Sequence, residues 1–183
     1  MVLRVLATFV DVCHTMQLPC GHEYCKSCMA QLREKRVAQT CPLCRKPLPP
    51  GPDKLHDLGW RIYAKIVKVV DPDCNADWEH ITLSPAQQRG MDQSRALVLE
   101  AAAQGHMDAQ AVCGAMYAFG RGVVRDHCLA FVYNEKAAQQ GHIGSQANMG
   151  VHYENGFGCE QSYEQAAEWF EKAADQGLSL IHI

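Results

Sequence analysis

Six of the ten cysteines lie near the start of the chain, and their spacing is that of metal ligands. Five of the six, with one embedded histidine, follow the pattern Cys-x-His-x2-Cys-x2-Cys-x12-Cys-x2-Cys. The residues of the pattern are Cys20, His22, Cys25, Cys28, Cys41 and Cys44. Two cysteines two residues apart offer two thiolates from one tight turn, and zinc takes four such ligands in a tetrahedron. Six ligands exceed one site, so the spacing predicts two zinc sites.

The start of the chain favours metal binding over disulfides. The segment 2–10 is apolar but short, is interrupted by Arg4 and lacks a small-residue cleavage site. It therefore fits neither a signal peptide nor a membrane span. Without a secretory signal, clustered cysteines with a histidine among them indicate a metal site. We expect a cytoplasmic or nuclear protein without a membrane span.

Residues 13–48 resemble the RING finger family of zinc domains. In that family the ligand pairs interleave, and the third and fourth ligands share a metal with the seventh and eighth. The resemblance thus implies one complete zinc site, made of Cys20, His22, Cys41 and Cys44. Cys25 and Cys28 are left as half of a second site.

The other half of the second site is not evident in the sequence. The family pattern places a Cys-x2-Cys pair upstream, and no such pair precedes Cys20. Cys13, next to His14, is closer to Cys20 than the family spacing allows. Two explanations stay open. The chain begins inside the domain, or Cys13 serves as a substitute ligand.

The resemblance also implies a function. RING-type ubiquitin ligases form no covalent intermediate but hold a ubiquitin-charged conjugating enzyme in a reactive orientation. Arg45 follows the last ligand, where active members carry the cation that bridges enzyme and ubiquitin. Pro42 and Leu43 correspond to the apolar surface that contacts the conjugating enzyme, and Leu32 or Val37 would extend it. The alternatives are a solvated surface arginine and apolar residues that pack around the zinc.

After this domain, assigned to residues 1–48, the sequence predicts a linker with one helix over residues 49–83. Prolines and a glycine between Lys46 and Asp53 mark the boundary. Apolar residues at helical spacing over 55–70 predict an amphipathic helix. Ser84-Pro85-Ala86-Gln87 has the form of a capping box, and it predicts a helix that runs to Gln104.

The second half of the chain contains an internal repeat. Segments 105–140 and 141–176 align without a gap and are identical at 14 of 36 positions. Each segment predicts a helix, a Gly-x-Gly turn and a second helix, a period typical of solenoids. A phosphate-binding loop is a poor interpretation of the glycines, because no strand precedes them. Tyr133 and Trp169 occupy matching positions, which we expect to lie in the core.

The repeats resemble Sel-one-like repeats, relatives of the tetratricopeptide repeat that serve as protein-binding scaffolds. We assign residues 84–177 to this part. The terminal segment 178–183 fits no repeat position, and we expect it to be an artefact encoded by a sequencing adapter.

Together these features predict a small zinc-stabilised α+β RING domain followed by an all-α solenoid of helix-turn-helix repeats. Residues 1–50 hold 7 Lys/Arg against 3 Asp/Glu and residues 96–177 hold 4 against 10, so neither half is basic enough to predict nucleic-acid binding.

The preferred function is a RING-type ubiquitin ligase whose partners are a conjugating enzyme and a protein substrate bound by the repeats. The alternative is a zinc-dependent scaffold without ligase activity. A metalloenzyme is disfavoured, because a site with four protein ligands has no open position.

Overall fold

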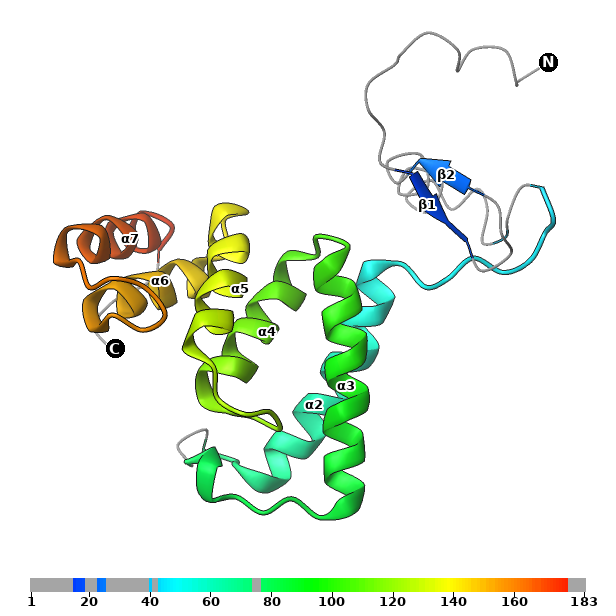
Figure 1. Ribbon diagram of the computed structural model, residues 1–183, viewed down its shortest axis with the longest axis horizontal. Helices are drawn as coiled ribbons and strands as arrows, with labels where there is room; N and C mark the ends of the chain where they lie inside the picture. The colour runs from blue at the N-terminus through cyan, green and yellow to red at the C-terminus, as the bar shows by residue number, and fades with distance from the viewer. Residues whose placement is uncertain (1–14, 19–22, 26–39, 41–42, 74–76, 178–183) are drawn as a thin grey trace, which may run out of the picture. The chain divides into compact units, whose positions relative to one another are not determined.

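The computed structural model describes residues 15–18, 23–25, 40, 43–73 and 77–177. The chain divides into two compact units, Met1–Gly51 and Pro52–Ile183. Strands occur in the first unit and α-helices make up the second (Figure 1). This agrees with the predicted fold class, a small α+β domain followed by an all-α array.

The described part of the first unit contains a short antiparallel hairpin. Strand β1, Thr15–Gln17, pairs with β2, Glu23–Cys25. The pairing of Gln17 with Glu23 brings the two ends of the connection 18–22 together. A second antiparallel contact, an isolated bridge between Thr40 and Pro47, does the same for the connection 41–46.

The second unit begins with two long helices, α2 (Pro52–Val70) and α3 (Pro85–Ala103). Between them lies η1, a 3-10 turn over Trp78–His80. The capping box predicted for α3 is present: the Ser84 side chain accepts from Gln87 N, and the Gln87 side chain accepts from Ser84 N. The local sequence was sufficient to predict where α3 begins, because a capping box satisfies the free amide groups of the first turn without tertiary partners.

Helix α2, which the sequence assigned to a linker, packs along α3. The approach is close at Gly59, where an added Cβ would lie 2.7 Å from a Val98 methyl group. Ser94 Oγ donates to the Gly59 carbonyl at 2.8 Å. Leu55 and Val98 belong to one buried apolar cluster. The helical array therefore starts at α2.

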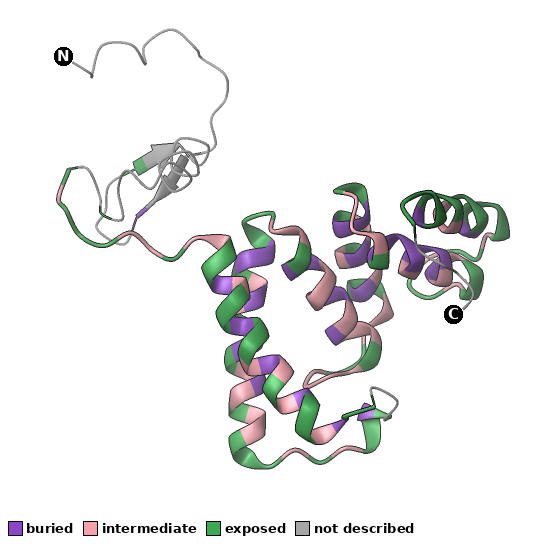
Figure 2. Ribbon diagram, turned by 180° about the vertical axis from the view of Figure 1, so that it is seen from behind, coloured by how far each residue is buried: buried purple, intermediate pink, exposed green. Residues whose placement is uncertain are grey.

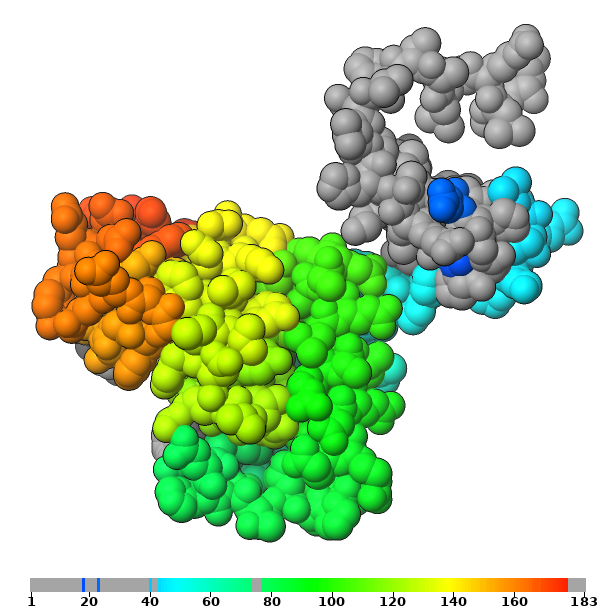
Figure 3. Space-filling view, in the orientation of Figure 1, coloured from blue at the N-terminus to red at the C-terminus, as the bar shows by residue number. Residues whose placement is uncertain are grey.

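Four helices of equal length follow, one pair for each repeat. They are α4 (Met107–Phe119), α5 (His127–Gln139), α6 (Ile143–Asn155) and α7 (Tyr163–Asp175). Each helix packs against the next along the chain, and α4 also touches α6. The space-filling view shows side chains closing the space between α3, α4 and α5 (Figure 3). Packing between neighbours in sequence is the hallmark of a solenoid.

The same side-chain hydrogen bonds recur in both repeats, 36 residues apart. Gln110 Nε2 donates to the Ala102 carbonyl at 3.2 Å, and Gln146 Nε2 donates to the Ala138 carbonyl at 3.3 Å. The carbonyl oxygens of these two glutamines accept from Gln140 and Gln176, at 2.6 and 2.7 Å. We call these bonds the glutamine ladder. It explains why glutamine recurs at fixed positions of the repeat.

The expectation that Tyr133 and Trp169 lie in the core was only partly right: both are half-buried, and Tyr133 packs against the buried cluster that contains Leu55 and Val98. Trp169 instead lies under the ammonium group of Lys172, 4.2 Å from the ring centroid.

Buried positions recur along the helices (Figure 2). Small residues and methionines fill most of the core, together with the buried amides of Gln110, Asn134 and Gln146, of which Asn134 is fully buried. In the first repeat Asn134 fills the close approach at Gly114, where an added Cβ would lie 2.7 Å from its side chain, whereas in the second repeat the ring of Phe170 packs against Gly150 at the matching position.

A buried histidine is linked to the core amide of Asn134. His152 is 4% exposed, and its Nδ1 lies 2.6 Å from the Phe157 carbonyl, so Nδ1 must carry the proton. Its Nε2 then accepts from Asn134 Nδ2 at 3.3 Å, and the Asn134 oxygen accepts from Asn148. Burial lowers the pKa of His152, against a smaller opposing effect of the bond to Phe157.

We expect this network to make the helical unit acid-sensitive. A histidine with a lowered pKa binds fewer protons folded than unfolded, so stability falls as pH drops below the unfolded value of about 6.5. Protonated His152 would also turn an N–H toward the Asn134 amide. The melting temperature should therefore fall between pH 7 and pH 5. His152→Gln should flatten this pH dependence of the melting temperature. His80→Gln, which replaces an exposed imidazole, should leave it unchanged. Equal pH profiles for both variants would contradict this assignment.

Candidate metal centre and partner-binding groove

Few of the predicted site residues fall in the part of the chain that the structure describes. Cys44 lies in a turn with Leu43 and is half-buried, and Cys25 is the last residue of β2. Arg45 is described as well, and the other candidates lie outside the described residues. They are the ligand candidates Cys13, Cys20, His22, Cys28 and Cys41 and the contact candidates Leu32, Val37 and Pro42.

Backbone pairing closes both stretches of chain that carry predicted ligands of the complete site. The hairpin joins the ends of the segment whose sequence contains Cys20 and His22, and the Thr40–Pro47 bridge joins the ends of the segment with Cys41 and Cys44. Short segments closed by backbone pairing keep two ligands close before metal binds, which limits the entropy cost of forming the site. Three thiolates and one imidazole are a donor set that zinc prefers.

Arg45 has an unusual backbone. Its φ is 59°, and it is the one non-glycine residue with a positive φ among those described. For a residue with a Cβ this left-handed conformation costs about 1–2 kcal/mol. The residue is exposed, beside Leu43, whose side chain is 70% exposed. A cation and an apolar side chain thus reach solvent on either side of Cys44.

The cysteines of the helical unit have other surroundings. Cys113 is 1% exposed in the core of α4, and burial raises its pKa to about 12. It therefore stays a thiol and packs as an apolar residue. Within the described segments, no group of three or more His, Cys, Asp or Glu side chains could hold a metal ion.

The helical unit contains a groove of about 390 Å³ bounded by α2, α4 and α6. Its middle is lined by small side chains of α4, Ala111 and Ala115. Trp60 of α2 forms one wall and is 44% exposed. Asn148 of α6 lies on the other side. A concave apolar surface with a few polar groups at its edges is the usual form of a binding site.

Histidines and carboxylates gather where α2 and α4 begin. His56, which lines the groove, stacks on His106 with ring centroids 4.6 Å apart. His106 Nδ1 caps α4 by accepting from Ala109 N, and its Nε2 lies 3.4 Å from Asp53. Asp108, an exposed residue, lines the groove at the same end.

The one arginine of the groove is already engaged. Arg121 lies 3.8 Å from the buried carboxylate of Asp71 and donates to the Tyr63 hydroxyl at 3.3 Å. Its guanidinium also lies over the rings of Trp78 and Phe119. Asp108 is therefore the exposed charged side chain in the lining of this groove.

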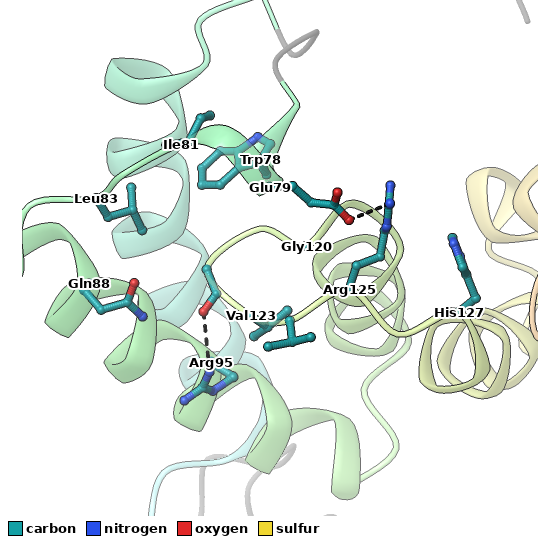
Figure 4. A pocket seen from close by; sticks show the side chains of 12 residues that line it. Trp78, Glu79, Ile81, Leu83, Gln88, Arg95, Gly120, Val123, Arg125 and His127 are labelled. Atoms are coloured by element: carbon teal, nitrogen blue, oxygen red, sulfur yellow. Dashed lines mark hydrogen bonds and ion pairs between the residues drawn. The ribbon is translucent and has the colours of Figure 1, made fainter.

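A second hollow, of about 710 Å³, lies between η1, α3 and the turn after α4 (Figure 4). Trp78, Ile81 and Val123 give it apolar walls. Its cations are paired: Arg125 with Glu79 and Arg95 with Asp92, and Arg95 also donates to the Gly122 carbonyl. The charges around this hollow thus do not favour one kind of ligand.

The sequence did not point to the groove. Its residues come from three helices, and α2 was assigned to a linker. The exposed Trp60 was the available signal, since a large aromatic side chain at a polar position of an amphipathic helix indicates a contact surface. The histidine caps, His106 and its repeat partner His142, were also missed, because histidine is not among the usual N-cap residues.

Comparison with known proteins identifies the N-terminal segment. Residues 8–44 match the family described as zinc finger, C3HC4 type (RING finger). The metal of this segment is therefore zinc. A stretch of 39 residues is 41% identical to E3 ubiquitin-protein ligase rnf213-beta of Danio rerio. That stretch is 21% of this chain and 1% of that protein, so this chain spans a very small part of its curated relative.

The repeats match a family as well. Residues 108–142 and 143–178 each match the Sel1 repeat. Among solved structures, a Sel1 repeat protein from Oxalobacter formigenes is 29% identical, with 68% of this chain and 87% of that chain covered and a TM-score of 0.49. The antigen c5321 of uropathogenic Escherichia coli, which displays an SLR fold, is 23% identical, with 82% and 33% covered and a TM-score of 0.48. The chain thus carries a RING-type zinc finger followed by Sel1 repeats. None of the described helices is long and apolar enough to cross a membrane.

Proposed function

We propose that the protein is a RING-type ubiquitin ligase whose helical unit recruits a protein substrate. The RING match and the short identity with an E3 ligase support the first half of the proposal. The Sel1 repeats and the groove over α2, α4 and α6 support the second. In this proposal the zinc finger holds the charged conjugating enzyme while the groove holds the protein to be modified.

Zinc has a structural role in this proposal. Cys20, His22, Cys41 and Cys44 would hold one ion, and four protein ligands fill a tetrahedral site. The ion supplies folding energy to a small domain whose apolar core is too small to fold alone. Cys25 and Cys28 would contribute to a second site, with Cys13 or an upstream pair completing it.

The observation that carries the proposal is the conformation of Arg45. Glycine or asparagine would fill a position at φ 59° at lower cost, yet arginine stands there, directly after a ligand and exposed. Backbone strain of this kind is found where function needs a particular side chain. The planar guanidinium donates several hydrogen bonds at once, which suits the bridging of two proteins. Holding the ubiquitin thioester in one orientation would accelerate its attack by a lysine.

Arg45→Asn tests this role without disturbing the backbone. Asparagine accepts a positive φ but cannot form the charged bridge, so zinc content should stay unchanged while ubiquitin discharge slows. Loss of charged hydrogen bonds worth about 1.5–3 kcal/mol corresponds to a decrease of roughly tenfold to a hundredfold. Single-turnover discharge from a charged conjugating enzyme to free lysine measures it on the zinc-loaded protein. Arg45→Lys, which keeps the charge, should restore only part of the rate.

The same assay separates the ligase from the alternative, a zinc-dependent scaffold. A scaffold would bind zinc and a protein partner but leave the discharge rate at the level of the conjugating enzyme alone. Equal rates for the unmodified protein and Arg45→Asn would likewise place Arg45 among ordinary surface residues.

A further inference from the structure

We infer that the groove over α2, α4 and α6 binds a protein segment in which a lysine or arginine stands next to apolar side chains. The inference deepens the proposed function and rests on it, since it gives the class of protein segment that the helical unit would recruit. It comes from the shape of the groove, the exposure of one aromatic ring and the sign of the surrounding charge.

The apolar part of the segment is defined by the middle of the groove. Ala111 and Ala115 present only methyl groups, so the surface between α2 and α6 is low and apolar. Trp60 stands beside it and is 44% exposed, although it contacts the buried Tyr63 at 5.5 Å between centroids. A tryptophan held in place at the edge of a hollow offers a large area to a partner at little entropic cost.

The basic part of the segment is defined by the end of the groove where α2 and α4 begin. Asp108 lines the groove there, and the side chains of Asp53 and Asp57 are 88% and 66% exposed. Their neighbour His56 is neutral at pH 7, because burial and the adjacent His106 lower its pKa. Arg121 is held by Asp71. Three carboxylates thus gather at this end, with Asp53 and Asp57 lying 3.4 and 3.7 Å from His106 and His56, and the face of Trp60 can also attract a cation.

The charge of the whole helical part points the same way. Residues 52–177 hold 17 Asp and Glu against 10 Lys and Arg. Such an excess repels acidic segments and accelerates the association of basic ones. A basic segment with apolar neighbours therefore fits both the apolar lining of the groove and the negative electrostatic potential around it.

A positional-scanning library of biotinylated decapeptides tests the inference on the full chain. We expect selection of Lys or Arg at one position and of Leu, Ile or Phe beside it. In fluorescence anisotropy with the selected peptide, Trp60→Ala should weaken binding at least about tenfold, as for a buried aromatic anchor. Asp108→Asn should weaken it about threefold and reduce its salt dependence, as for an edge charge. Replacing the selected basic residue by Glu should abolish binding.

Two matched variants serve as controls. Leu58→Ala removes a side chain of α2 that is 49% exposed and does not line the groove. Glu164→Gln removes an acid from the first turn of α7, the position that Asp108 has in α4. Both should leave peptide binding unchanged, and circular dichroism should show all four variants folded. Selection of acidic residues, no selection, or equal effects of groove and control variants would overturn the inference.

The outcome is independent of ubiquitin transfer. Peptide selection without discharge activity would refute the ligase proposal and leave the groove assignment standing. Discharge activity without basic selection would refute the groove assignment alone.

Discussion

Cys41→Ser is expected to remove zinc from the complete site and to unfold the first unit while the helical unit stays intact. One of three thiolates would be lost from a closed tetrahedral site. Changes to outer-shell partners alone lower metal affinity 10–100-fold, so loss of a ligand should lower it by roughly 100-fold or more. Because zinc supplies the folding energy of such small domains, loss of metal and loss of structure should coincide. Native mass spectrometry and near-ultraviolet circular dichroism measure the two effects.

Cys128→Ser is the matched control, since it removes an exposed thiol from α5. Its zinc content should equal that of the unmodified protein. If Cys41→Ser retained the same number of zinc ions as this control, Cys41 would not be a ligand. If the unmodified protein bound no zinc, the assignment of the four ligands would fail as a whole.

Gly158→Ala should destabilise the helical unit by about 2–5 kcal/mol, the largest effect we expect from a single methyl group in this chain. The backbone of Gly158 has a φ of 75°, which costs a residue with a Cβ about 1–2 kcal/mol. An added Cβ would also lie 2.3 Å from the His127 carbonyl oxygen and 3.0 Å from the Cys128 Cα. These are backbone atoms of α5, which cannot turn aside, and overpacking typically adds 1–3 kcal/mol.

Substitutions at Gly141 and Gly122 separate the cost of the positive φ from the cost of steric contact. Gly141→Ala meets the penalty for positive φ alone, because no atom lies within 4 Å of its new Cβ. Gly122→Ala adds contacts with a side chain rather than with backbone atoms, at 2.7 Å from the terminal methyl group of Met91 and 2.9 Å from its Cβ. Urea unfolding should therefore order the losses as Gly141, Gly122, Gly158. A loss at Gly141 as large as that at Gly158 would show that steric contact with α5 is not the cause.

Features encoded locally could be predicted from the sequence. Ser84 and Gln87 predicted the start of α3, and the repeat predicted two helices in each segment, which the structure has as α4 and α5 and as α6 and α7. The spacing of cysteines predicted the zinc finger, because ligand geometry is set by short stretches of chain. These signals need no knowledge of distant partners.

Features set by tertiary contacts were missed or misjudged. Nothing in the sequence around Tyr133 tells that the adjacent Asn134 fills the close approach at Gly114. The role of α2 depends on Gly59 meeting Val98, 39 positions away. The positive φ of Arg45 could not be predicted, since the residue type disfavours it. The groove could not be predicted either, because it forms only when α2, α4 and α6, which are separate in the sequence, pack together.

The glutamine ladder has a consequence for how the array can change in length. Each glutamine pairs with a partner at a fixed offset, so duplication of a whole unit of 36 residues copies donors and acceptors together. An insertion of one residue within α4 would turn Gln110 away from both Ala102 and Gln140 and leave buried amides unpaired, at about 1–3 kcal/mol each. The glutamine ladder thus permits the array to lengthen by whole repeats of 36 residues and makes insertions of any other length destabilising.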